Sequence, residues 1–161
     1  MDSTQFWQFS LALYPPNQQL LLQWQDHYQL NVNLALFLLF LHRQQQPLSE
    51  TGLVSLHQQL QQFSQQVTQP LRAVRRTLPT PWLDEQMQRP FRQQLLNAEL
   101  AAEQLEQQLL LQHYLQLAAP TVSTQESAVL TRYLQLLQAP TGQLQQQIID
   151  LYQQAGQLQL P

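Results

Sequence analysis

Apolar residues recur every three or four positions along most of this chain, and that spacing predicts helices throughout. Ten prolines punctuate the pattern and mark the expected helix ends. The first helix is expected to stop at Pro15–Pro16, with Asn17 capping the second. The predicted helices cover residues 3–14, 18–30, 31–43, 49–78, 90–117, 124–138 and 141–155.

The segment Val32–Leu41 has almost no polar face, since Asn33 is its one polar residue. A helix that is apolar all round must be enclosed by others, so we expect it at the centre of the fold. A membrane span needs about 20 apolar residues, and this stretch is half that length.

Two longer segments follow. Apolar spacing continues past Pro70, which lacks an N–H donor, so the pattern over residues 49–78 predicts one bent helix or two abutting helices. Pro90 suits the first turn of a long helix ending near Leu117. Its expected buried seam repeats every three or four residues, through Phe91, Leu95, Ala98, Ala102, Leu105 and Leu109.

A length of 161 residues predicts one domain, an all-α irregular bundle of six or seven helices. Valine and isoleucine are too few for a substantial sheet. We expect residues 1–118 to form the core, and residues 123–155 a helical pair packed on it. Ser123–Glu126 has the form of a capping box, and residues 156–161 read as a loose tail.

Composition excludes several functions. Glutamine and leucine supply 72 of 161 positions, charged residues are 11%, and the net charge is −3 with no lysine. A lysine-free acidic chain is a poor nucleic-acid binder and lacks a basic membrane-surface helix. Without cysteine there are no disulfides or thiol nucleophiles. The N-terminus has no cationic leader, so a cytoplasmic protein is expected. The sequence has no glycine-rich phosphate loop, no supported Ser-His-Asp order and no HExxH motif, so we expect no cofactor and no catalytic site.

Several motifs resemble a proteobacterial family of small all-helical proteins of unknown function. They are FWQFSLALY (6–14), LQWQD (22–26), LNVNLALFLL (30–39), PLRAVRR (70–76) and AELAAEQLEQ (98–107). The resemblance covers about the first 115 residues and implies a helical bacterial protein. It carries no activity or cofactor.

Carboxylates line one flank of the long helix, at Glu99, Glu103 and Glu106, with His113 on the same side. Such groups inside a bundle are the ingredients of a metal site. The Glu-x-x-His pairs typical of dimetal bundles are absent, and Glu106 and His113 are about 10 Å apart along the axis. A metal site is therefore the weaker alternative.

The favoured interpretation pairs this flank with arginines of the preceding helix. An antiparallel neighbour would bring Arg75, and with it Arg72, toward Glu99 or Glu106, in a network that fixes helix register. Arg76 is expected to point away from the core and to be available for a partner.

The long helix has a second apolar side, at Leu96, Leu100, Leu111 and Leu115. Surplus apolar surface favours a non-catalytic interaction or regulatory protein, with a protein partner or self-association, and Arg76, Leu96 and Leu100 as contacts. A second alternative is a sensor that binds a small apolar ligand among the aromatic N-terminal helices.

Overall fold

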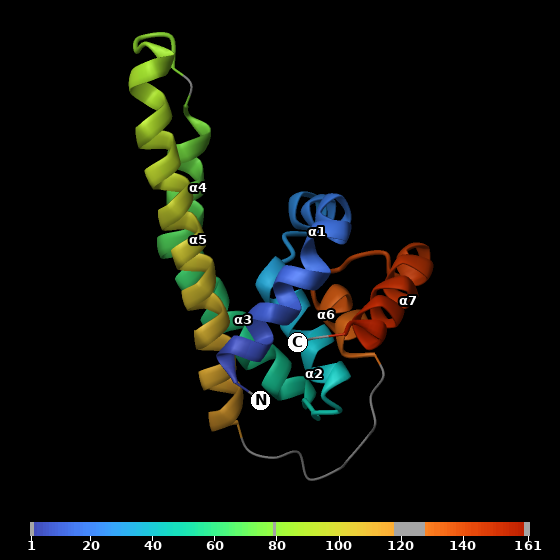
Figure 1. Ribbon diagram of the computed structural model, residues 1–161. Coiled ribbons are helices and arrows are strands. Elements are labelled where there is room, and N and C mark those ends of the chain that lie inside the picture. The colour runs from blue at the N-terminus through green and yellow to red at the C-terminus, as the bar shows by residue number, and fades with distance from the viewer. Residues whose placement is uncertain (1, 79, 118–127, 160–161) are drawn as a thin grey trace.

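The structure is a computed structural model that describes residues 2–78, 80–117 and 128–159. Every regular element in those ranges is helical, which confirms the predicted all-α class. A two-helix arm projects from a helical body (Figure 1). The described helices include none long and apolar enough to cross a membrane. The elements are α1 (Ser3–Tyr28), α2 (Val32–Arg43), α3 (Glu50–Phe63), the π-helical turn η1 (Ser64–Thr68), α4 (Gln69–Arg76), α5 (Glu85–Gln116), α6 (Val129–Leu136) and α7 (Thr141–Gln157).

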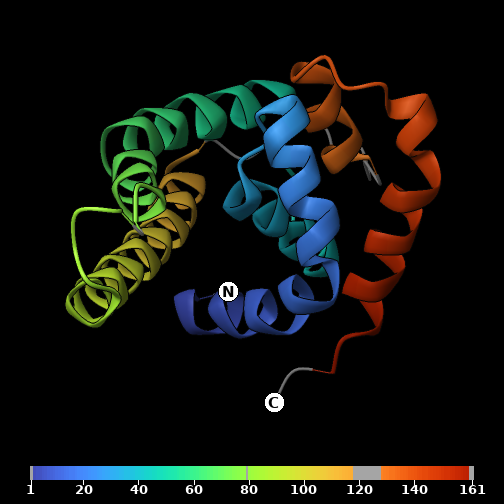
Figure 2. The same cartoon turned by 90° about the horizontal axis from the view of Figure 1, so that it is seen from above.

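The two helices expected at the N-terminus are one helix, α1. Pro15 and Pro16 lie inside it, and the ribbon changes direction partway along (Figure 2). The prolines remove backbone donors, so the helix bends instead of ending. Asn17 is therefore not a cap. Its side-chain amide donates to the Leu13 carbonyl over 2.9 Å and to Oε1 of Gln154 on α7 over 2.7 Å.

The apolar helix α2 lies at the centre, as its sequence predicts. The Asn31 side chain caps it by accepting from the Leu34 N–H over 3.0 Å, and every residue from Asn33 to Leu41 is buried. Helices α1, α3, α5, α6 and α7 all contact it. The rings of Phe6 and Phe9 on α1 pack against Phe37 and Phe40 on α2, with centroids 5.1–5.4 Å apart.

The expected bent helix over 49–78 is present as α3, η1 and α4 without a break. Ser49 caps its start by accepting from the Gly52 N–H over 3.1 Å. The wider π turn comes just before Pro70, whose missing N–H leaves one helical hydrogen bond unmade. The last helical residue is Arg76.

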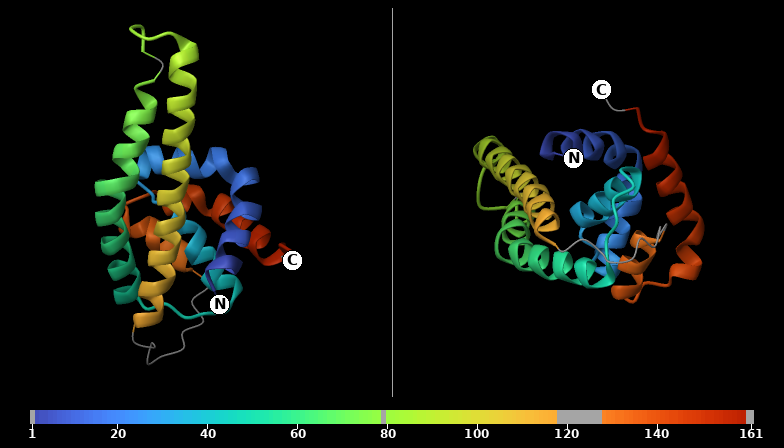
Figure 3. Two further views of the ribbon diagram at one scale, coloured as in Figure 1. Left: turned by 60° about the vertical axis from the view of Figure 1, so that its left-hand side comes forward. Right: turned by 90° about the horizontal axis from the view of Figure 1, so that it is seen from below.

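Helix α5 runs back along α3 and α4 to complete the arm (Figure 3). It begins at Glu85, five residues before the expected start, so Pro90 lies within the helix. The expected seam is also wrong, because Phe91 and Leu105 are about half exposed. Leu111, expected to face outward, is buried. The buried face of α5 is largely polar: Gln88, Glu99, Ala102, Glu106, Gln107, Leu110 and Leu111.

Helices α6 and α7 pack on α2 and on each other. Tyr133 of α6 is fully buried, and its hydroxyl accepts from the Asn31 N–H over 3.0 Å. Helix α7 continues to Gln157, two residues into the segment expected to be loose. The capping box expected at Ser123–Glu126 lies outside the described residues.

Candidate functional site

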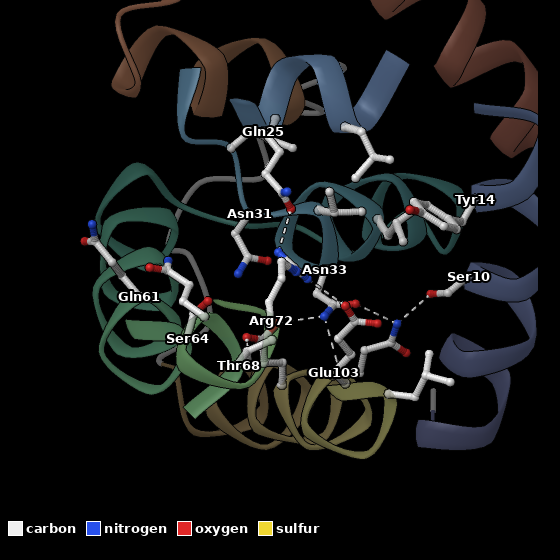
Figure 4. Close-up of a pocket in the computed structure, with 18 of the residues that line it drawn as sticks. Ser10, Tyr14, Gln25, Asn31, Asn33, Gln61, Ser64, Thr68, Arg72 and Glu103 are labelled. Atoms are coloured by element: carbon white, nitrogen blue, oxygen red, sulfur yellow. Dashed lines mark hydrogen bonds and ion pairs between the residues drawn. The ribbon is translucent and has the colours of Figure 1, made fainter. Parts of the chain in front are cut away.

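Two arginines of α4 converge on one carboxylate of α5. Arg72 Nε donates to Glu99 Oε1 over 2.7 Å, and Arg75 Nε donates to Glu99 Oε2 over 2.5 Å. Arg72 also donates to Glu103 Oε1 over 2.8 Å and to Gln25 Oε1 of α1 over 3.2 Å. Figure 4 shows Arg72 extending between Gln25 and Glu103. The arm is thus held to α1 at its base by charge-assisted bonds.

Glu106 belongs to a different set of bonds from the one expected. It is 2% exposed, and its carboxylate accepts from Asn33 Nδ2 and from Thr68 Oγ1, each over 2.7 Å. The bonds of Arg72 and Arg75 go to Glu99, Glu103 and Gln25 instead. Of the two carboxylates proposed as partners for these arginines, Glu99 is the one they bind, and Glu106 is held by two neutral donors instead.

Gln107 extends this network toward α1. Its Nε2 donates to Ser10 Oγ and to Asn33 Oδ1, each over 3.0 Å. Gln107 is 5% exposed, yet its Oε1 has no hydrogen-bond partner among the described residues. A buried acceptor left unpaired costs about 1–3 kcal/mol, so this oxygen requires an explanation.

A cavity of about 700 Å³ lies over this network, between α1, α2, η1, α4 and α5. It differs from the apolar pocket expected among the N-terminal aromatics, because most of those rings form the core. Trp7 and Tyr14 line the cavity, whereas Phe6 and Phe9 are fully buried against α2. Its remaining lining is mainly polar and includes Ser10, Gln25, Asn33, Thr68, Arg72, Glu103, Glu106 and Gln107.

The surroundings shift the pKa values of two neighbouring carboxylates in opposite directions. Burial acts to raise the pKa of Glu99, but the hydrogen bonds and charges of Arg75 and Arg72 outweigh it, and the pKa is lowered. The pKa of Glu103 is raised by burial, and the charges of Glu99 and Glu106 add to that rise against the opposing effect of Arg72. Glu103 therefore holds its proton to a higher pH than Glu99.

The four metal candidates do not converge. Glu99 and Glu103 are engaged by Arg72, and Glu106 by Asn33 and Thr68. His113 Nε2 lies 2.9 Å from Ser55 Oγ, where α5 packs against α3, and is engaged there. The described part of the chain holds no group of three or more His, Asp or Glu side chains arranged to bind a metal ion.

The residues expected to contact a partner lie on the arm. Arg76 and Leu100 are exposed, and both line the rim of the cavity. Leu96 is 36% exposed and is not part of the cavity lining.

Sequence reasoning missed Ser10, Asn33, Thr68 and Gln107 as members of the polar network. Asn33 carried a readable signal, because it is a single polar residue inside an otherwise apolar helix. Gln107 carried none, since glutamine also fills exposed helix positions throughout this chain.

Comparison with known proteins gives one match. Residues 5–110 match the model of a family described as a protein of unknown function, DUF2390. Searches of curated proteins and of solved structures gave no match. The match spans α1 to most of α5, including the bonds among Arg72, Glu99 and Glu106 and the cavity above them. The chain therefore belongs to the DUF2390 family, whose function is unknown.

Proposed function

We propose that this protein is a non-catalytic protein-binding module whose contact surface is the outer end of the α4/α5 arm. The observation that carries the proposal is a group of large exposed apolar side chains at that end. Trp82 is 87% exposed, Met87 68%, Phe91 51% and Leu83 50%. Tryptophan, phenylalanine and methionine are enriched at protein interfaces, and tryptophan is a frequent binding hot spot.

The arm tip is held in a defined conformation, which favours binding. Gln88 is 5% exposed, and its side chain bonds the backbone of the turn. Its Oε1 accepts from the Thr80 N–H over 2.7 Å, and its Nε2 donates to the carbonyls of Thr80 and Leu83 over 2.9 and 2.5 Å. A turn that is already ordered loses less conformational entropy on binding.

Charge narrows the class of partner. Residues 82–92 at the outer end contain Arg89 and Arg92 against Asp84 and Glu85, so this end of the arm carries no net charge. The partner best suited to it is a protein with an apolar groove.

The test begins with a photo-crosslinking amino acid at position 82 in cells of the native host, with position 115 as the control. Leu115 is 65% exposed but lies at the opposite end of α5. We expect one protein to be crosslinked from position 82 and not from 115. That purified partner should bind Trp82→Ser at least about ten-fold more weakly than wild type, while Leu115→Ser binds normally.

Affinity should change little as salt is raised, because the outer end of the arm carries no net charge. Three outcomes overturn the proposal: equal affinity of the two variants, a Trp82-dependent dimer of the purified protein, or Trp82-dependent flotation with phosphatidylglycerol vesicles. The second would assign the tip to self-association and the third to a lipid surface.

A further inference from the structure

The cavity between the arm and the body has the size of a small-molecule site. Its volume of about 700 Å³ falls within the roughly 300–1,000 Å³ usual for such sites. One wall is apolar, with Trp7, Leu11 and Tyr14 of α1. The opposite side is the polar network of α2, η1 and α5 (Figure 4). The arrangement suits a ligand with a carbon skeleton and a polar head group.

The polar side is rich in acceptors that lack donors. Gln107 Oε1 is buried and unpartnered. Glu106 is 98% buried, and it receives its two hydrogen bonds from the uncharged side chains of Asn33 and Thr68. Burying a carboxylate without a cation is costly, so Glu106 favours the approach of a positive charge.

Glu103 adds to this deficit of donors. Arg72 donates to Glu103 Oε1, while Glu103 Oε2 accepts no hydrogen bond from a described residue. Arg72 is shared with Glu99 and Gln25, so its charge does not neutralise Glu103 alone. A cation between Glu103 and Glu106 would relieve the repulsion between these two carboxylates.

The charged side chains that line the cavity also favour a positively charged ligand. Asp26, Glu103 and Glu106 provide three carboxylates, against the guanidinium groups of Arg72 and Arg76. Because Arg72 is already paired with Glu99 and Glu103, Arg76 is the lining arginine without an ion pair among the described residues. The complementary head group is one that donates several hydrogen bonds and carries a positive charge, as a primary ammonium does with its three N–H donors.

We propose that this cavity binds a small organic molecule with a primary ammonium group. The ammonium donates to the carboxylate of Glu106 and to Gln107 Oε1, and the carbon skeleton lies against Trp7, Leu11 and Tyr14. The sequence contains no lysine, so no side chain of this protein or of a second copy can supply the ammonium.

Calorimetric titration of the full chain tests this with probes that differ in the head group. Tryptamine and hexylamine carry the ammonium on an aromatic and an aliphatic skeleton. Indole-3-propionate replaces the ammonium of tryptamine with a carboxylate, and 3-ethylindole removes the charge. We expect at least one amine to bind with 1:1 stoichiometry, and the anion and the neutral indole to bind at least ten-fold more weakly.

Charge-matched variants locate the head group. Glu106→Gln and Glu103→Gln should each weaken amine binding by at least ten-fold. Glu85→Gln makes the same charge change on the same helix, at the exposed far end of the arm, and should bind as wild type does. If Glu106→Gln fails to fold, Glu103→Gln decides the matter, because its side chain is 30% exposed and tolerates substitution better.

Two outcomes overturn the inference. One is the absence of binding by either amine up to about 10 mM, and the other is binding that ignores the head group or survives both glutamine variants. The result is independent of the arm-tip proposal, because Trp82→Ser is expected to leave amine binding unchanged.

Discussion

The carboxylate of Glu99 lies 2.7 Å from Nε of Arg72, and this pair joins the two helices of the arm where the arm meets the body. Glu99 is 4% exposed, while the Arg72 side chain keeps 20% of its surface in water. Arg75 holds the second oxygen of the same carboxylate. Ion pairs in such surroundings fix the register of neighbouring helices more than they add stability.

A double-mutant cycle on this pair should show strong coupling. Glu99→Leu leaves two guanidinium groups without their shared partner, and we expect the free energy of unfolding to fall by about 2–3 kcal/mol. With Arg72→Met in the cycle, urea denaturation should give a coupling energy of about 1 kcal/mol or more. Glu85→Gln, an exposed control on α5, should stay within about 0.5 kcal/mol of wild type. A coupling energy near zero would show that the pair does not set the register.

The two acidic neighbours should give opposite pH profiles of stability. The pKa of Glu99 is lowered on folding, so its contribution is present above the unfolded pKa of about 4.3 and is lost as pH falls through the folded value. The stability of Glu99→Gln relative to wild type should therefore drop as pH rises from 3 to 6.

The pKa of Glu103 is raised, so wild type loses stability as pH rises from about 4.3 through the folded value. Relative to wild type, Glu103→Gln should accordingly gain stability as pH rises. Urea denaturation curves collected at several pH values measure both differences. Profiles of the same sign for the two variants would contradict the assignment of opposite shifts.

The hydroxyl of Tyr133 should contribute measurably to stability. It accepts from the N–H of Asn31, and Tyr133→Phe leaves that donor unpaired at the start of the central helix. We expect a loss of about 1–2 kcal/mol in thermal or urea unfolding. Tyr28→Phe is the control, because the Tyr28 hydroxyl has no hydrogen-bond partner among the described residues, and it should change stability by less than about 0.5 kcal/mol. Equal effects of the two variants would show that the Asn31 bond is unimportant.

Two helical glycines should respond differently to alanine. A Cβ at Gly142 meets nothing within 4 Å, so Gly142→Ala should stabilise the protein by about 0.5–1 kcal/mol through helix propensity. A Cβ at Gly52 would lie 2.9 Å from Leu48 Cδ1, 3.1 Å from Ser49 Oγ and 3.2 Å from Leu117 Cδ1. Gly52→Ala should therefore melt below Gly142→Ala, because crowding offsets the gain in propensity. Equal melting temperatures would mean that this corner of the fold relaxes freely.

Local sequence patterns correctly predicted the structural features that depend only on neighbouring residues. Helices predicted to start near residues 31 and 49 do so because the side chains of Asn31 and Ser49 satisfy backbone donors within three residues of themselves, whatever the rest of the fold. The burial of α2 followed from its lack of a polar face. The sequence wrongly predicted that α1 ends at its two prolines. A proline shows only that a backbone donor is missing. Whether the helix then ends or bends depends on the contacts that hold its two halves. Here Asn17 bonds α7 just beyond the bend.

The rotation of α5 required the tertiary structure. Its sequence carries apolar residues on several sides, so periodicity allowed more than one buried face. The structure turns Glu99, Glu106 and Gln107 inward, because their partners lie on other helices and a polar group is buried where it finds a bond.

The sequence by itself determined an all-helical chain with a central apolar helix, a bent helix through Pro70 and arginines opposite carboxylates. These features depend on helix periodicity, capping and charge, which act over a few residues. The tertiary structure decided the face that α5 buries, the two neutral donors to Glu106, the unpaired oxygen of Gln107 and the cavity above it. These depend on contacts between residues as far apart in the chain as Ser10 and Gln107, and helix packing alone sets such distances.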